Sequence, residues 1–466
     1  MIDVVIPYFD DVRLLEAILV ALSRQHDHRG GGPLRDVRIV VADDASVVRP
    51  PARLLGGDVT TVRSELVGYH PSTARNLGAR SLDGDVIVFL DGDTVPAPDY
   101  VSRLVEPVLS GTADLTTGRR RHGDLDGLSP VAIADFAGHP TPERLLPEPQ
   151  WLARGQEWTD RLRSGTSDTY QYVISAVLTV RRESFESVGG FEERFDSYGG
   201  EDWEFAYRCW NDGWDLLHVP EAHAFHDGPD VEGRPDDHDV KTVESLRIVE
   251  LVPASSTRLS GVVYEVPDLE IELTVAHGDL TSSAVAVHSL LSQRPGDLRL
   301  RLVGDADVVG RLSDLVHDPR LVPVELPAAS SARCVVTVSG PAEFGVDALA
   351  ELSADVADGR LAERRVQVGD VEIVARSNRL RRRSARHPSD HVRSRSADRE
   401  AAESVPAEPA SDPSPDPSPG HRATTVRPTP SAAFASWSRH RDLQGQAPAV
   451  TPSPAVALEV DVDDEA

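Results

Sequence analysis

The chain has 466 residues and a formal net charge of −28, so it is long enough for two or three domains and too acidic for a general nucleic-acid binder, which needs lysine and arginine for phosphate contacts. Two cysteines, Cys209 and Cys334, exclude a disulfide framework and favour a reducing compartment. The sequence opens on a strand pattern rather than a signal peptide, and no apolar run reaches the roughly 18 residues of a spanning helix. We expect a cytoplasmic protein and leave open peripheral contact with the inner face of the cell membrane.

The first segment alternates strand and helix signals. Short apolar strands are expected at 4–6, 37–42 and 86–90, with an amphipathic helix over 11–25 and a second helix that Ser72 caps. The third strand is continuously apolar, which is typical of a strand buried on both faces of a parallel sheet. This order predicts an α/β fold with a mostly parallel sheet flanked by helices, whose ligands gather beyond the carboxyl ends of the strands.

Later elements are less regular. The proline-containing stretch 110–169 is expected to be loop-rich. Strands are predicted at 172–180 and 216–219, and between them a helix over 201–212 that ends at Gly213.

Residues 255–375 repeat the rhythm of the first segment. Strands are predicted at 270–275 and 298–303, with a helix over 284–293 between them, and residues 334–347 can be laid without gaps beside residues 86–99. We interpret this region as a degenerate copy of the first α/β unit. Ser339 and Pro341 replace the two carboxylates of the first unit, so this copy is expected to bind no metal and to be non-catalytic.

The composition changes again near residue 376. Seven arginines lie within 379–395, and a Pro/Ser-rich segment with an acidic end follows, which predicts a disordered tail over 376–466. The basic stretch 379–395 either attracts anionic lipid head groups or forms a solvated linker. The sequence therefore predicts three parts, at 1–250, 255–375 and 376–466.

Two carboxylates, Asp91 and Asp93, follow the strand predicted at 86–90 and are separated by Gly92, which permits close backbone approach. Oxygen ligands suit Mn²⁺ or Mg²⁺, which is held by one or two carboxylates together with substrate phosphate oxygens. The structural alternative is a turn with solvated acids. The buried strand in front of the pair favours the metal site.

Several segments carry a resemblance to a known family. In their order and spacing, residues 43–46, 72–79 and 89–94 resemble family-2 glycosyltransferases of the GT-A fold. Residues 188–195 and 198–208 look like the acceptor half of galactosyltransferases and polypeptide GalNAc-transferases. Each motif alone is loose, but the ordered set is specific and covers about half of the chain.

The resemblance implies a donor site at the strand ends. Pro7 and Tyr8 would line the base and ribose pocket, and Asp44 would accept a hydrogen bond from a uracil-type base. Arg75 would approach the diphosphate, and Asp91 would face the donor ribose and sugar. The alternatives are a turn cap for Asp44 and a surface ion pair for Arg75.

The acceptor half begins at Gly199–Gly200, after which Glu201 and Asp202 open a helix. Carboxylates stabilise a helix N-terminus, which is one explanation for them. An attacking hydroxyl also needs a general base. By resemblance Asp202 is this base, Glu201 orients hydroxyl groups, and Gly200 belongs to the nucleotide-sugar site. One base without a separate nucleophile implies inversion at the anomeric carbon.

The resemblance also assigns the metal ligands. Asp93 would bind the ion together with His226, because an imidazole is compatible with Mn²⁺. His226 lies in a cluster with His218 and His223, of which His223 is the second choice, and a packed or solvated histidine is the alternative. The arginines at 119–121 either cover the donor or form a solvated charge run.

These observations predict a metal-dependent glycosyltransferase. Its expected partners are a nucleotide-diphosphate sugar, with UDP favoured and GDP or dTDP as the alternatives, and a glycan, a lipid-linked compound or another hydroxyl acceptor. One alternative is a carbohydrate- or partner-binding protein on the same scaffold. The other is a sugar-phosphate nucleotidyltransferase, whose glycine-rich phosphate loop is absent from residues 7–13.

Overall fold

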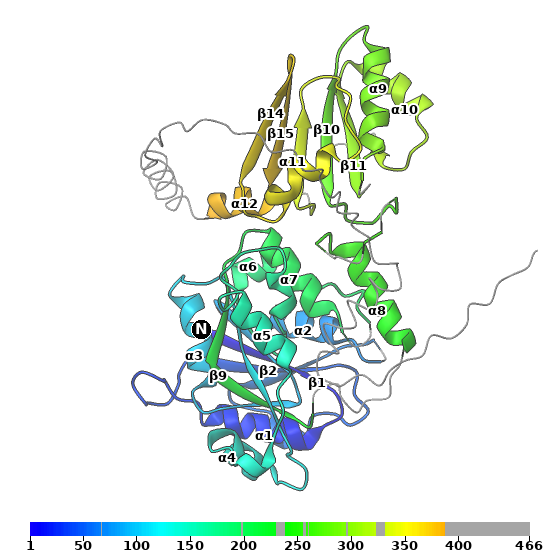
Figure 1. Cartoon of the computed structure of the whole chain (residues 1–466). Coiled ribbons are helices and arrows are strands. Elements are labelled where there is room, and N and C mark those ends of the chain that lie inside the picture. Colours follow the sequence, from blue (N-terminus) through cyan, green and yellow to red (C-terminus); the bar gives the residue numbers. More distant parts are fainter. Residues whose placement is uncertain are drawn as a thin grey trace, which may run out of the picture.

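The structure, a computed structural model, describes residues 1–386 except 67, 197–198, 230–237, 255–257, 260, 295–296 and 323–330. The described part forms two α/β units, which lie one above the other in Figure 1. Helix α8 (His238–Leu251) follows the first unit and packs against its helix α7 (Glu201–Asn211). Among the described residues, no helix has the length and apolar character needed to span a bilayer.

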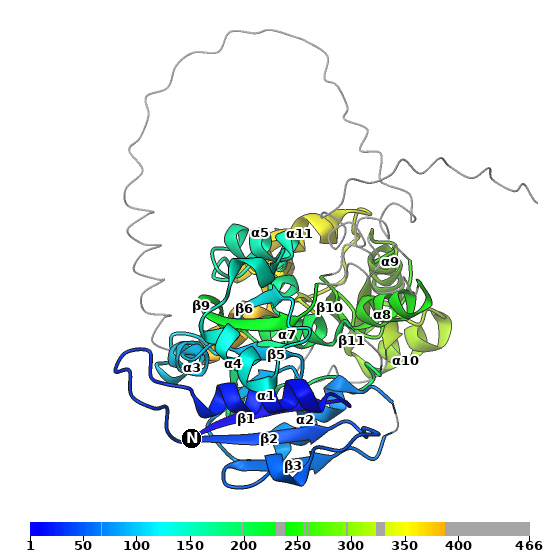
Figure 2. The same cartoon turned by 90° about the horizontal axis from the view of Figure 1, so that it is seen from below.

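The first unit is built on one large sheet in the order β3-β2-β1-β4-β8-β6-β9-β5, with β7 paired to β6 (Figure 2). The first four strands of that order run parallel, and β8 pairs antiparallel to both β4 and β6. The strands are β1 (Ile2–Tyr8), β2 (Val37–Asp43), β3 (Val59–Arg63), β4 (Val86–Leu90), β5 (Thr94–Pro96), β6 (Leu115–Gly123), β7 (Leu145–Leu146), β8 (Val177–Arg181) and β9 (Leu216–Asp227).

Helices cover both faces of this sheet. Val4 and Ile6 of β1 pack with α1 and α4 on one face, whereas Val5 packs with α2 and α7 on the other, as the two-residue period of a strand requires. In Figure 1, α1 and α4 lie below the sheet, and α5, α6 and α7 lie above it. The remaining helices of this unit are α1 (Val12–Ser23), α2 (Pro71–Arg80), α3 (Tyr100–Leu109), α4 (Pro130–Gly138), α5 (Gln150–Trp158) and α6 (Arg182–Ser187).

The strand at 86–90 and the helix from Glu201 are confirmed, but the expectation of a loop-rich stretch over 110–169 was wrong. The stretch contains β6, α4 and α5. Its prolines misled the sequence interpretation because Pro130 is in the first turn of α4, where proline favours a helix start, and Pro149 directly precedes α5.

The second unit has a smaller sheet in the order β12-β11-β10-β13-β15-β14 with one compact core. Its elements are β10 (Leu269–Val275), α9 (Leu280–Leu291), β11 (Leu298–Gly304), α10 (Ala306–Leu315), β12 (Leu321–Val322), β13 (Cys334–Val338), α11 (Ala348–Ala357), β14 (Glu363–Val368) and β15 (Val371–Ser377).

Strand pairing in the second sheet repeats the first, register included. In the first unit Ile2 pairs with Val37 and Val86, and in the second Leu269 pairs with Leu298 and Cys334. The next strand is antiparallel in both sheets. This agreement supports the ungapped alignment of residues 334–347 with 86–99 and the interpretation of a degenerate repeat.

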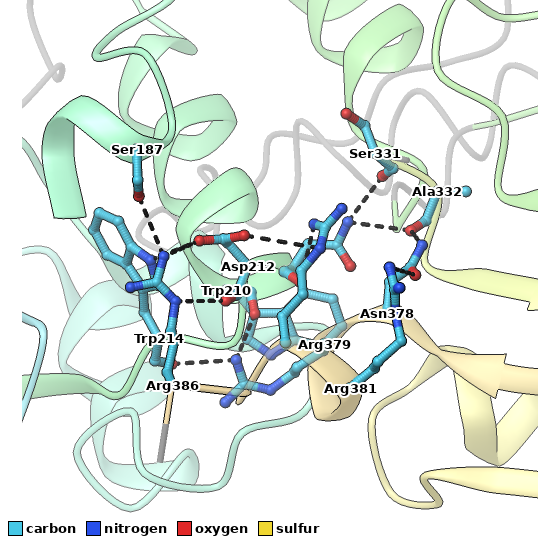
Figure 3. A network of polar contacts seen from close by, with 12 residues as sticks. Ser187, Trp210, Asp212, Trp214, Ser331, Ala332, Asn378, Arg379, Arg381 and Arg386 are labelled. Carbon is cyan, nitrogen blue, oxygen red and sulfur yellow. Dashed lines mark hydrogen bonds and ion pairs between the residues drawn. The ribbon is translucent and has the colours of Figure 1, made fainter. Parts of the chain in front are cut away.

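Helix α12 (Asn378–Arg386) ties the second unit to the first (Figure 3). The Arg379 guanidinium is buried, donates to the backbone carbonyls of Trp210 and Trp214, and lies 5.2 Å from the Trp210 ring. Arg386 pairs with the Asp212 carboxylate and lies 5.6 Å from the Trp214 ring. These partners lie at the C-terminal end of α7, where the helix dipole favours cations.

The expected start of disorder at residue 376 was therefore wrong for residues 376–386, which complete β15 and form α12. The sequence composition showed the cluster of arginines. It could not show their hydrogen-bond and ion-pair partners, which lie some 170 residues earlier in the chain. Residues 387–466, including the rest of the basic stretch, lie outside the described residues.

Replacing Arg379 with alanine tests this tie. The two carbonyls would lose their buried donor, which costs about 1–3 kcal/mol per unsatisfied group, so we expect a lower free energy of unfolding in urea. Arg381→Ala is the control, because Arg381 is exposed and its side chain bonds to Asn378 of its own helix. Equal stability of both variants would contradict the described packing.

Candidate functional site

The site is centred on the loop between β4 and β5, which carries Asp91, Gly92 and Asp93. A Cβ atom on Gly92 would lie 2.5 Å from the carbonyl oxygen of Pro7, near the end of β1. Only glycine therefore lets this loop lie against the neighbouring strand. The close approach brings the two carboxylates to the carboxyl ends of the parallel strands, as the sequence predicted.

Arg75 of α2 bridges the two halves of the first unit. It is 2% exposed, and its Nη2 donates to Asp91 Oδ1 (2.7 Å) while its Nη1 donates to Glu201 Oε1 (3.0 Å). Burial alone would lower the pKa of Arg75, but the charges of Asp91 and Glu201 outweigh this and raise its pKa above the usual value. Arg75 is thus part of a buried double ion pair and not of the surface ion pair that was the alternative, and its expected approach to the diphosphate stays a prediction.

Two polar atoms of the bridge have no hydrogen-bond partner among the described residues. They are Arg75 Nε and Glu201 Oε2, and both are buried. Buried polar atoms are nearly always paired, so such atoms at a strand-end site point to a missing ligand.

Asp43 and Asp44 lie at the end of β2. Asp43 is held by Arg63 and by the backbone N–H of Ser46 (2.9 Å). Asp44 is 2% exposed and accepts from the backbone N–H of His70 through Oδ2, while its Oδ1 is buried without a partner among the described residues. Burial raises the pKa of Asp44 above its usual value, against the lowering effect of the His70 bond. The unused acceptor fits the expected role toward a base N–H.

Tyr8 lies beside Asp43 at the end of β1, and its hydroxyl donates to the Val48 carbonyl (2.6 Å). Burial and the nearby acids raise the pKa of Tyr8 to about 12, so the phenol stays protonated. Sequence reasoning missed two further aromatic residues here. Phe9 and Tyr69 lie edge to face with ring centroids 5.7 Å apart, and both are more than 40% exposed. Two partly exposed aromatic rings therefore lie near the strand ends.

The N-terminus of α2 was also missed. The helix begins at Pro71, and the N-cap residue His70 makes no side-chain cap bond, so Ser72 is not the cap that the sequence suggested. The hydroxyls of Ser72 and Thr73 are buried without partners among the described residues. An uncapped helix N-terminus attracts anions such as phosphate. Proline in the first turn was the sequence signal for the earlier start.

Asp93 and His226 meet across paired strands. Thr94 of β5 pairs with His226 of β9, and His226 Nε2 lies 3.3 Å from Asp93 Oδ2. Burial would raise the pKa of Asp93, but the contacts with His226 and the charge of Arg120 outweigh it and hold this pKa well below its usual range. The Asp93 side chain is 45% exposed and is therefore accessible to a ligand.

The histidine is oriented by a backbone carbonyl. His226 Nδ1 lies 3.2 Å from the Gly228 carbonyl oxygen, which calls for a proton on Nδ1 and leaves the lone pair of a neutral ring on Nε2. His122 of β6, the strand partner of His226, contacts the same carbonyl at 3.0 Å, and the two rings are 5.0 Å apart. His122 was not singled out by the sequence motifs, because it lies on a strand that was not predicted, and Arg120 was named only as part of the run 119–121.

The pair fits a divalent cation. An Nε2 lone pair that faces a carboxylate oxygen needs a cation between them, either a proton or a metal ion. Neighbouring ligand atoms of an octahedral ion with bonds of about 2.1 Å are roughly 3.0 Å apart, close to the observed 3.3 Å. Among the described residues no group of three His, Cys, Asp or Glu side chains forms a cage. Asp93 and His226 would thus leave the remaining positions to phosphate oxygens and water.

Two glycines set the start of α7. Gly199 and Gly200 have φ values of 101° and 89°, and Cβ atoms there would lie within 3.0 Å of Glu244 of α8. Glu201 and Asp202 form the first turn of α7, and Glu201 is joined to Asp91 through Arg75. Asp202 therefore follows directly on a residue of the site. Tyr198 lies outside the described residues.

The other expected residues lie around this centre. The Asp93 contact is made by His226, and no contact of His223 with Asp93 is found among the described residues. Burial, with the charges of nearby arginines, lowers the pKa of His223 and lowers that of His218 to about 4. Arg119 and Arg121 both bind the Glu148 carboxylate, so these two side chains are paired and are not a simple solvated charge run, and the expected cover over the donor stays a prediction.

Comparisons with known proteins find relatives of the first unit. Residues 3–157 match the model of glycosyl transferase family 2, and residues 163–227 match the model described as the N-terminal domain of galactosyltransferase. The first 227 residues are therefore a glycosyltransferase domain. Its residues 3–157 are similar to family 2, and the unit has the GT-A fold.

Relatives are similar over part of their length. A chondroitin synthase of Pasteurella multocida is 26% identical over 65% of this chain and 33% of the relative. A probable N-acetylgalactosaminyltransferase 9 of Caenorhabditis elegans is 30% identical over 42% of this chain and 34% of the relative. The chain thus spans about a third of the length of these relatives. A mannosyltransferase of Pyrobaculum calidifontis, solved with GDP-Man and Mn²⁺, covers 56% of this chain and 65% of that chain at 18% identity and a TM-score of 0.37, too distant to add to the argument.

Gly92→Ala tests the close approach at the centre of the site. The new methyl group would meet the Pro7 carbonyl, so the loop must shift, and we expect unfolding to be easier by roughly 1–3 kcal/mol. Gly310→Ala in α10 is the control: it meets no atom within 4 Å and should keep or raise stability by up to about 1 kcal/mol. Urea unfolding of both variants measures the difference. An unchanged unfolding midpoint for Gly92→Ala would refute the close approach of Gly92 to Pro7.

Proposed function

We propose that this protein is a metal-dependent, inverting glycosyltransferase that moves a sugar from a nucleotide-diphosphate sugar to an acceptor hydroxyl. The observation that carries the proposal is the Arg75 bridge, which joins Asp91 on the donor side to Glu201 on the acceptor side. A transferase needs both substrates in one place, since the gain from proximity depends on holding the reacting groups together.

The donor would bind along the strand ends. Asp44 Oδ1 accepts from the base, which favours UDP, and Pro7 and Tyr8 line the base and ribose pocket. The N-terminus of α2 attracts the diphosphate. Asp91, fixed by Arg75, faces the ribose and sugar.

Asp93 and His226 would hold Mn²⁺ or Mg²⁺. When bound there, the ion neutralises the charge that develops on the departing nucleotide. The contribution of the chain itself is the orientation of both ligands, by Thr94 on the carboxylate and by the Gly228 carbonyl on the imidazole.

Asp202 would take the proton of the acceptor hydroxyl. Its position in the first turn of α7, directly after Glu201, is fixed by the two left-handed glycines before it. Glu201 keeps one oxygen, Oε2, for a substrate hydroxyl while Arg75 holds the other. Since no second carboxylate is assigned as nucleophile, the sugar would be transferred with inversion.

The names of the relatives favour a glycan or glycoside acceptor: they include chondroitin synthase and validoxylamine A glucosyltransferase. We do not assign membrane contact to the basic stretch, because Arg379, Arg383 and Arg386 bind the first unit. The second unit, with Ser339 and Pro341 in place of the carboxylates, would have a structural or binding role.

A donor panel tests the transferase and its metal. The wild type should hydrolyse at least one of UDP-glucose, UDP-galactose, UDP-N-acetylglucosamine, UDP-N-acetylgalactosamine, UDP-glucuronate, GDP-mannose or dTDP-glucose, and chelation should stop the reaction. Asp93→Ala should lose at least about 100-fold in rate, because the ion contributes several kcal/mol. Asp83→Ala, a 91% exposed acid at the opposite end of β4, is the control. No turnover and no binding of any donor would refute the proposal.

Asp202→Asn separates a base from a helix-capping residue. Loss of a general base should lower kcat by about 10²–10⁴-fold while the Kd for the donor is kept, and proton NMR of the wild-type product should show the inverted anomer. Glu183→Gln, an exposed acid in the first turn of α6, is the matched control. If Asp202→Asn changed stability but left kcat intact, the residue would be a cap only.

A further inference from the structure

A hollow lies beside α7, and neither of the proposed metal ligands lines it. It has a volume of about 210 Å³. Residues of α5, of the 3₁₀ turn η3 (Thr169–Tyr172) and of α7 form its walls. Four aromatic side chains line it, with two polar side chains: Trp151, Trp158, Tyr172, Trp203, Arg154 and Gln171.

The aromatic walls are held in place by packing. The ring centroid of Trp151 lies 6.4 Å from that of Tyr172 and 6.5 Å from that of Trp203. Gly155 of α5 is needed for this arrangement, since a Cβ there would lie 2.0 Å from the Tyr172 ring. Trp203 is only 5% exposed and forms a rigid wall.

Trp158 is different, because it is 68% exposed at the end of α5. The residues that follow, Asp160, Arg161 and Leu162, all have positive φ, between 49° and 72°. Three consecutive non-glycine residues in the left-handed region are unfavourable, so the surroundings must hold this turn. Leu162 is buried, and the Arg161 carbonyl accepts from the backbone N–H of His218. The backbone turn that follows Trp158 is therefore held in place by its surroundings.

We propose that this hollow, the aromatic subsite, holds a pyranose ring of a carbohydrate acceptor. The inference rests on the proposed function and deepens it, since it names the acceptor class. Trp203, a wall of the subsite, belongs to the first turn of α7 together with the proposed base Asp202, so the subsite and the base share one helix end. The C–H face of the ring stacks on the indoles, and its hydroxyls bond to Arg154 and Gln171 at the rim.

The size and chemistry of the subsite favour one sugar ring over other occupants. Pockets for drug-sized ligands measure roughly 300–1,000 Å³, so about 210 Å³ accepts a single ring and no helix of a partner. Aromatic walls with a few polar groups suit a ring that is apolar on one face and carries hydroxyls at its edge. The cation in the rim, Arg154, also suits a sugar with a carboxylate.

Binding and kinetics test the aromatic subsite separately from catalysis. The probes are the methyl β-glycosides of glucose, galactose, N-acetylglucosamine, N-acetylgalactosamine and glucuronate, each followed by saturation-transfer NMR on the full chain. At least one should receive saturation at ring protons of one face, and Trp158→Ala should abolish the signal while Trp158→Phe retains it. With the preferred glycoside as acceptor, Trp158→Ala should raise its KM at least tenfold and leave kcat within about twofold.

Leu315→Ala is the matched control, because this α10 side chain is 67% exposed and remote from the subsite. It should leave both the NMR signal and KM unchanged. Equal saturation in wild type and Trp158→Ala, or saturation of none of the five glycosides, would overturn the inference while donor hydrolysis still upholds the transferase. Loss of the signal in Trp158→Ala without any donor turnover by the wild type would support the sugar site and refute the transferase.

Discussion

The site depends on one buried cation. The guanidinium of Arg75 joins Asp91, at the end of a parallel strand, to Glu201, at the start of a helix more than a hundred residues later. Without it, two carboxylates would approach each other in a poorly solvated pocket, and leaving a buried charge unpaired is strongly destabilising. The β4–β5 loop and the start of α7 are therefore held together by the same residue that neutralises their carboxylates.

The two units have matching strand pairing but different residues at the strand ends. Their sheets share strand order and register, but the second has Ser339, Gly340 and Pro341 where the first has two carboxylates around Gly92. The core positions need only apolar side chains of suitable size, so they persist, whereas the strand ends are free to change. Helix α12, which follows the last strand of the second unit, packs against the C-terminal end of α7 in the glycosyltransferase domain.

The sequence predicted the structural features that depend on local residue patterns. The apolar strand 86–90, the helix from Glu201 and the Asp91–Asp93 pair all follow from short-range signals, and the meeting of Asp93 with His226 followed from the resemblance. Features that depend on contacts with residues far away in the chain could not be predicted from the sequence. The role of Arg75 requires knowledge of Glu201, and β6 carries three arginines that hide its strand character until the partner strands are seen.

The most direct measurement of the central claim is pulsed electron paramagnetic resonance of Mn²⁺ bound to the full chain with UDP. Modulation by one imidazole nitrogen, together with coupling to phosphorus, should appear in the wild type, and His226→Ala should lose the nitrogen signal alone. Absence of nitrogen modulation in the wild type, or its persistence in His226→Ala, would contradict a site in which Asp93 and His226 share a metal ion with the donor diphosphate.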